Sequence, residues 1–153
     1  MLGISGFAHV SFTVSDLERS EAWYTEVLGL VNVREMRRDG YTKVILEDPG
    51  SGIAVSLTHH GDKNSGDSFS EFRTGLDHVS FAVPSVAELE RWRERLDKFG
   101  VPRTEILPTR TGAVLIFRDP DNLQLEFYAA EGSVDEEGRP TAKWIHAFPP
   151  VTD

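Results

Sequence analysis

The chain contains an internal repeat. The hexapeptide His-Val-Ser-Phe-Thr-Val at residues 9–14 returns as His-Val-Ser-Phe-Ala-Val at residues 78–83, an offset of 69 with five of six positions identical. The same offset aligns Trp23 with Trp92, and 7 of the 15 positions from residue 9 to residue 23 match. Unrelated sequences would match at about one position in such a window. The repeat predicts two structural units of the same kind in one chain.

Each copy opens with a segment in which polar and apolar residues alternate. A period of two is typical of a strand that turns one face to water and the other to a core. We therefore expect a polar face and a core face in each opening strand. In the first copy the polar face consists of His9, Ser11 and Thr13, and the core face of Val10, Phe12 and Val14.

A helix is expected after each opening strand, over residues 15–29 and 85–100. A hydroxyl residue followed three positions later by glutamate has the spacing of a capping box, and each helix then ends at a glycine. The capping-box pairs are Ser15 with Glu18 and Ser85 with Glu88. Further strands are expected at 31–34, 42–46 and 53–58 in the first copy and at 104–106, 113–117 and 123–128 in the second.

An Asp-Pro dipeptide precedes the last strand of each copy, at residues 48–49 and 119–120. Asp-Pro favours a turn, and the second turn is one residue shorter than the first. Aligning the last strands on this basis makes Ser56 and Glu126 equivalent. Two strand–helix–strand–strand–strand modules, with helices on one face of a mostly antiparallel sheet, predict an α+β fold. Its polar strand faces would line a common cavity.

The expected domain organisation is a single domain over residues 1–130. Module one spans about 7–60, a linker rich in Gly, Ser, Asp and Asn spans 61–75, and module two spans about 76–130. The remaining residues, 131–153, form a polar tail. The tail residues expected to dock are Trp144, Ile145 and Phe148.

The composition excludes several classes of function. Lys and Arg total 16 against 25 Asp and Glu, a net charge of −9, whereas nucleic-acid binding needs clustered positive charge. The sequence has no signal-peptide pattern and no apolar run of roughly 18 residues that would span a membrane. The absence of cysteine suits a reducing compartment and leaves only His, Asp and Glu to hold a metal. We expect a cytoplasmic protein whose partner is a small molecule rather than nucleic acid or membrane.

Two histidines and one glutamate are candidate metal ligands. His9 and His78 occupy the same position in the two opening strands, and Glu126 lies in the last strand on the same side as Gln124 and Tyr128. Two imidazoles and a carboxylate form a facial triad, which suits Fe, Mn, Ni, Co or Zn and leaves coordination positions open. The alternative interpretation is that both histidines only make hydrogen bonds and that Glu126 is a solvated acid.

Three segments of the chain form a specific pattern. They are His-Val-Ser-Phe-Thr-Val-Ser-Asp-Leu with Trp-Tyr-Thr-Glu-Val-Leu-Gly-Leu (9–17 and 23–30), Gly-Leu-Asp-His-Val-Ser (75–80) and Phe-Arg-Asp-Pro-Asp-Asn-Leu-Gln-Leu-Glu (117–126). Together they resemble the vicinal oxygen chelate superfamily, which includes glyoxalase I, bleomycin-resistance proteins, fosfomycin-resistance enzymes, methylmalonyl-CoA epimerase and extradiol dioxygenases. The resemblance covers about residues 7–130. It implies two βαβββ modules around a cup, with His9, His78 and Glu126 as metal ligands.

The residue at a fourth position separates branches of this family. The resemblance implies a carboxylate or amide there in glyoxalase I and the epimerase, whereas this chain has Ser56. A small residue with three ligands looks more like the extradiol dioxygenases or the fosfomycin enzymes. We predict a metal-dependent lyase, isomerase or extradiol-type dioxygenase that chelates adjacent oxygens of a small substrate. The alternative is a binding protein that sequesters a drug, as the bleomycin-resistance branch does.

Several other residues are predicted to act on the substrate. His60 and Tyr128 are candidate acids or bases, although His60 lies about 13 Å along the strand from Ser56. The alternative for His60 and its neighbour His59 is a solvated loop. Exposed edge strands favour a homodimer, with the site either within one chain or across two. The predicted substrate-binding residues are Ser56, Phe69, Phe72, Arg73 and Gln124.

Overall fold

The structure is a computed structural model that describes residue 3 and residues 6–130 of the 153-residue chain. It divides into two compact units, Met1–Ser68 (unit 1) and Phe69–Asp153 (unit 2), with the boundary inside the expected linker. The tail predicted to dock, with Trp144, Ile145 and Phe148, lies outside the described residues. Within the described part, no helix has the length and apolar character to cross a membrane.

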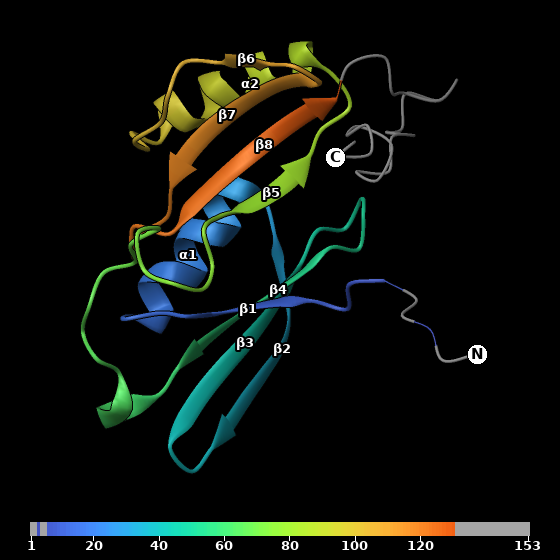
Figure 1. Cartoon of the computed structure of the whole chain (residues 1–153). Coiled ribbons are helices and arrows are strands. Elements are labelled where there is room, and N and C mark those ends of the chain that lie inside the picture. The colour runs from blue at the N-terminus through green and yellow to red at the C-terminus, as the bar shows by residue number, and fades with distance from the viewer. Residues whose placement is uncertain (1–2, 4–5, 131–153) are drawn as a thin grey trace. The chain divides into compact units, whose positions relative to one another are not determined.

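Unit 1 is a four-stranded sheet with one long helix packed against β3 and β4 (Figure 1). The strand order is β1-β4-β3-β2, in which β1 runs parallel to β4 and the other neighbours are antiparallel. The elements are β1 (Val10–Thr13), α1 (Leu17–Leu28), β2 (Val31–Arg38), β3 (Tyr41–Glu47), β4 (Ala54–His59) and the 3-10 helix η1 (Gly61–Lys63).

Unit 2 repeats this arrangement with the order β5-β8-β7-β6, and α2 lies against β7 and β8 (Figure 1). Again the outer pair, β5 with β8, is parallel and the others are antiparallel. The α+β fold with two βαβββ modules is therefore confirmed. The elements are β5 (Val79–Ala82), α2 (Val86–Lys98), β6 (Leu107–Thr109), β7 (Gly112–Arg118) and β8 (Gln124–Ala130).

The strand register confirms that Ser56 and Glu126 occupy equivalent positions. Ser56 lies opposite Ser11 in unit 1, and Glu126 lies opposite Ser80 in unit 2. Ser11 and Ser80 are themselves equivalent in the repeat. Because side chains of opposite residues share a face of the sheet, each pair belongs to the polar face of its unit.

The two Asp-Pro turns are closed by the same backbone bond over different lengths. Asp48 N donates to Ile53 O at 3.0 Å, across five residues, and Asp119 N donates to Leu123 O at 3.2 Å, across four. This difference confirms the shorter second turn that the alignment of the last strands required.

The core faces pack aromatic side chains under each helix. In unit 1 Tyr24 of α1 is fully buried, with its ring centroid 6.2 Å from that of Phe12. In unit 2 the Phe127 ring stacks with Trp92 of α2 at 4.2 Å and with Phe117 at 4.8 Å. Complete burial of one such side chain stabilises a fold by about 1.5–3 kcal/mol. The predicted core face thus attaches each helix to its own sheet.

The predicted cap of the first helix is wrong by one residue. Asp16, not Ser15, is the N-cap, and its Oδ1 accepts a hydrogen bond from Arg19 N at 2.9 Å. An aspartate caps a helix as well as a serine does, so the carboxylate nearer the helix takes the position. The second helix is capped as predicted, because Ser85 Oγ accepts from Glu88 N at 3.2 Å.

The predicted strand at residues 104–106 is also wrong, since the strand in this region is β6. Thr104 N donates to Ile116 O at 2.9 Å, as in a ladder, but Ile116 N donates to the Thr104 side chain at 3.2 Å. A hydroxyl thus takes the place of the carbonyl that a regular strand would supply. Regular pairing resumes only at β6.

Candidate metal centre

The polar face of unit 2 brings together two of the three predicted ligands. β8 lies between β5 and β7, and Glu126 of β8 lies opposite Ser80 of β5. His78 directly precedes β5, and its Nε2 lies 3.7 Å from Glu126 Oε1. Only 8% of Glu126 is exposed. A carboxylate this buried needs a compensating charge or hydrogen bonds.

A second carboxylate orients the His78 ring. Asp77 Oδ1 lies 2.5 Å from His78 Nδ1. An ionised carboxylate can only accept, so Nδ1 carries the proton and a neutral ring presents its lone pair at Nε2. Metal-binding histidines usually have such a partner on the far nitrogen. Asp77 was not among the predicted site residues, although its place directly before His78 is a signal that the sequence contains.

This donor pair fits a divalent ion. Ligand atoms held about 2.0–2.2 Å from one ion lie roughly 3 Å apart. His78 Nε2 and Glu126 Oε1 are 3.7 Å apart, so a small movement would bring both to one ion. A neutral imidazole and a carboxylate together suit the transition metals considered above.

The third predicted ligand, His9, belongs to unit 1, where it directly precedes β1 and is exposed. Neither unit by itself contains three His, Asp or Glu side chains grouped to hold a metal, among residues 3 and 6–130. The three-ligand set that includes His9 therefore stays a prediction.

Ser56 is the unit 1 equivalent of Glu126 and is 1% exposed. Its Oγ is buried, and no described residue forms a hydrogen bond with it. Its cross-strand neighbour Ser11 instead approaches Thr58, with 3.4 Å between the hydroxyl oxygens. At the position where unit 2 carries a charge, unit 1 thus carries an unsatisfied hydroxyl.

Gln124, a predicted substrate-binding residue, accepts a hydrogen bond from Arg118, which also forms an ion pair with Glu71. Neither Arg118 nor Glu71 was predicted as a site residue. Arg118 Nη2 donates to Gln124 Oε1 at 2.9 Å and to Glu71 Oε1 at 2.7 Å. The Arg118 hydrogen bond lowers the pKa of the Glu71 carboxyl, which keeps it charged. The amide oxygen of Gln124 thus already accepts one hydrogen bond, whereas its N–H groups can donate to a ligand. Register places Arg118 opposite Gln124, a signal readable once the hairpin had been predicted.

The two predicted acid–base residues lie in different surroundings. Tyr128 Oη donates to Thr111 O at 2.7 Å and lies 2.6 Å from Thr111 Oγ1, so it fixes the turn between β6 and β7. His60 follows β4 in unit 1, and its ring centroid lies 6.2 Å from that of Tyr41. The catalytic roles of Tyr128 and His60 remain predictions.

The predicted substrate-binding residues of the linker begin unit 2. Phe69 is tied to the end of the sheet, because its N–H donates to Asp121 O at 2.9 Å and its carbonyl accepts from Asn122 Nδ2 at 3.0 Å. Phe72 is 92% exposed, and Arg73 is exposed as well. Their contact with a substrate remains a prediction.

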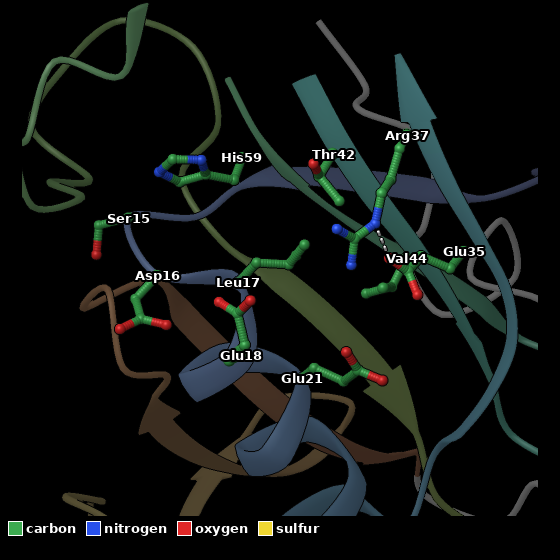
Figure 2. Close-up of a pocket in the computed structure, with 10 residues that line it drawn as sticks. All are labelled: Ser15, Asp16, Leu17, Glu18, Glu21, Glu35, Arg37, Thr42, Val44 and His59. Carbon is green, nitrogen blue, oxygen red and sulfur yellow. Dashed lines mark hydrogen bonds and ion pairs between the residues drawn. The ribbon is translucent and has the colours of Figure 1, made fainter. Parts of the chain in front are cut away.

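A cavity of about 380 Å³ lies beside the start of α1 (Figure 2). It is on the face of the unit 1 sheet that is opposite to the polar face with Ser56. Glu18 and Glu21 line it from α1, and Glu35 and Arg37 line it from β2, paired to each other at 2.7 Å. His59 also lines it, which places this histidine on the opposite face from Ser56 by strand parity. None of the three predicted metal ligands lines this cavity.

Comparison with known proteins gives a consistent family relationship. The family model for the Glyoxalase/Bleomycin resistance protein/Dioxygenase superfamily matches residues 6–127. The crystal structure of a glyoxylase/bleomycin resistance protein/dioxygenase domain from Frankia sp. EAN1pec is 40% identical, with a TM-score of 0.78 over 84% of this chain and 100% of that chain.

Two curated relatives are enzymes by name. The probable trivalent organoarsenical cleaving enzyme of Bacillus subtilis (strain 168) is 29% identical over 126 residues, 80% of this chain and 78% of that protein. Lactoylglutathione lyase GLX1 of Arabidopsis thaliana is 32% identical over 127 residues, 78% of this chain and 42% of that protein.

Proposed function

Because the chain belongs to the Glyoxalase/Bleomycin resistance protein/Dioxygenase superfamily, we propose that it is a divalent-metal-dependent enzyme acting on a small molecule with two adjacent oxygens. His78 and Glu126 would hold the metal together with His9. The reaction would be that of a lyase, an isomerase or an extradiol-type dioxygenase.

The observation that carries this proposal is the His78–Glu126 pair, 3.7 Å apart, with Asp77 on the far nitrogen of the imidazole. A structural histidine–glutamate ion pair would need a protonated ring, whereas a metal ligand must be neutral. Asp77 on Nδ1 favours the tautomer of the neutral ring that a metal needs, with the lone pair on Nε2. The His78 side chain is 36% exposed on the polar face, so the ring is not enclosed by the core.

The bound ion would supply Lewis-acid stabilisation of negative charge that develops on a substrate oxygen. The chain's own residues would do the rest. Asp77 holds the proton on His78 Nδ1, so that Nε2 keeps its lone pair. Glu126 brings a negative charge into a largely buried position. Ser56 is short and uncharged, larger than alanine by a single oxygen atom, and would leave room at the fourth position for a substrate oxygen.

The substrate class is constrained by what the chain lacks. The Bacillus subtilis relative is named for cleavage of trivalent organoarsenicals. Trivalent arsenic is a soft centre that favours thiolates, and this chain has no cysteine. Ser56 stands where the family resemblance implies a carboxylate or amide in glyoxalase I. We therefore favour an oxygen-chelating substrate other than an organoarsenical, outside the glyoxalase I reaction.

Metal analysis of purified protein tests the proposal. Wild type should hold one divalent ion per chain, removable by EDTA, whereas His78→Ala and Glu126→Ala should lose it while circular dichroism stays near wild type. His59→Ala is the matched control, because His59 lines the cavity on the other sheet face and should not affect the metal. Full occupancy in either ligand variant would contradict the assignment. Metal-free wild type that binds an aromatic or glycopeptide drug tightly would favour sequestration.

We also propose a cytoplasmic homodimer, with each site either within one chain or completed by His9 of the other chain; in the exchanged arrangement the two chains can complement each other. A mixture of His9→Ala with Glu126→Ala chains would then regain one intact site per heterodimer. Sites built within one chain would show no rescue, because each chain would carry one broken site. A monomer by light scattering would eliminate the exchanged arrangement.

A further inference from the structure

The hydroxyl of Ser80 is buried and has no hydrogen-bond partner among the described residues. Buried polar groups are nearly always satisfied in native proteins, so an unsatisfied hydroxyl needs an explanation. Replacing serine by alanine would remove the problem without changing the strand.

The duplicated position shows how such a hydroxyl can be satisfied internally. Ser11, the equivalent of Ser80, lies 3.4 Å from Thr58 Oγ1. By register, the unit 2 equivalent of Thr58 is Tyr128, since they lie opposite Thr13 and Ala82 respectively. The Tyr128 hydroxyl is bonded to Thr111 instead. Unit 2 has therefore kept the serine without its neighbouring partner.

The position of Ser80 links it to the candidate metal centre. Ser80 lies directly opposite Glu126, and His78 is two residues before it on the same strand face. No hydrogen bond joins Ser80 to Glu126 in the part of the chain that the structure describes. The hydroxyl proton thus has no acceptor beside the two proposed ligands, and a ligand would reach it once the side chains that cover the Oγ move. A hydroxyl bonds most strongly to an acceptor that carries negative charge.

We propose that Ser80 is a ligand-binding residue whose hydroxyl donates a hydrogen bond to an anionic oxygen of the small molecule held beside His78 and Glu126. This inference rests on the proposed function of the same centre. It adds a specificity element: the ligand must present an oxygen acceptor toward β5 as well as the oxygens that would chelate a metal.

The test uses Mn²⁺ and oxalate as probes, the latter an anion with adjacent oxygens. In Ser80→Ala protein the dissociation constant for Mn²⁺ alone should stay within about twofold of wild type. The dissociation constant for oxalate on the Mn²⁺-loaded protein should rise roughly three- to tenfold, the effect of one lost hydrogen bond. The unfolding temperature of the metal-free variant should equal or exceed that of wild type, because an unsatisfied hydroxyl has been removed.

Ser20→Ala is the control, since Ser20 Oγ is also buried without a partner among the described residues but lies on α1. It should leave both dissociation constants unchanged. Unchanged oxalate binding in Ser80→Ala, or a larger loss of Mn²⁺ than of oxalate, would overturn the inference while leaving the metal centre in place. Wild type that binds no Mn²⁺ would overturn the proposed function and the role of Ser80 with it.

Discussion

The two units share a scaffold and differ where the polar faces carry chemistry. The core residues of the opening strands are identical in both, with Phe12 matched by Phe81. On the polar faces, Ser56 in unit 1 corresponds to Glu126 in unit 2. The residue before the repeated histidine is Ala8 in unit 1 and Asp77 in unit 2. Unit 2 therefore has a histidine with an orienting carboxylate and a second proposed ligand, whereas the proposed ligand of unit 1 is His9.

This difference separates what stabilises a duplicated fold from what gives it a function. Burial of the core face determines the strand register, because a slip by one residue would expose every core side chain. The polar face carries no such constraint and can diverge. A centre built mostly by one unit is the expected result when each copy must keep its core.

The largest loss of metal affinity is expected when Glu126 of unit 2 is replaced by the serine that unit 1 has at this position. Glu126→Ser should lower the affinity for a divalent ion by more than about 100-fold, because it removes a charged ligand. The unfolding temperature of metal-free protein should equal or exceed that of wild type, since the substitution removes a buried carboxylate and leaves the core face intact. Titration calorimetry with Mn²⁺ measures the loss, and an affinity within tenfold of wild type would place the ligand elsewhere.

Removing the orienting carboxylate should have the next largest effect. Asp77→Ala, which copies Ala8 of unit 1, should lower metal affinity about 10- to 100-fold because the His78 ring loses its fixed orientation and proton position. Glu105→Ala removes an acid of the same unit that pairs with Arg103 instead, and serves as the control. Equal affinities in Asp77→Ala and wild type would mean that Asp77 does not act on the centre.

The reverse exchange should strengthen binding. Ser56→Glu gives unit 1 the residue type of unit 2 and should add a fourth ligand, tightening metal binding by about tenfold and closing a position meant for substrate. Oxalate binding to the Mn²⁺-loaded variant should weaken at the same time. If neither affinity changes, Ser56 does not face the ion.

The smallest effect, a change in thermal stability, is expected when the Arg118–Glu71 ion pair beside Gln124 is broken. The pKa of Glu71 is lowered in the folded state by its hydrogen bond to Arg118, so its contribution to stability is present at neutral pH. That contribution is lost as pH falls through the lowered pKa. Glu71→Gln should lower Tm by a few degrees or less at pH 7, and its Tm should converge with that of wild type in acid. A constant difference across pH would contradict the ionic contribution.

The sequence predicted the repeat, the strand faces and the Ser56–Glu126 equivalence because these follow from periodicity and turn length. It did not predict that Thr104 would interrupt a strand or that Asp16 would cap α1, since each depends on which oxygen accepts from a backbone N–H. At Thr104 the side-chain hydroxyl takes the place of a backbone carbonyl, and at α1 Asp16 takes the place of Ser15. Asp77 and Arg118 were missed for a related reason. They act through other side chains, and their signals, the adjacency of Asp77 to His78 and the register of Arg118 with Gln124, indicate proximity but not which atoms make contact.

In the proposed centre, His9 joins His78 and Glu126 around one ion. Electron spin echo envelope modulation of Cu²⁺-loaded protein counts the imidazoles bound to the metal and so measures whether both histidines bind. Wild type should show two coordinated imidazoles, and His9→Ala and His78→Ala should each show one. A single imidazole in wild type, lost in His78→Ala and unchanged in His9→Ala, would contradict the three-ligand site and leave unit 2 alone as the metal centre.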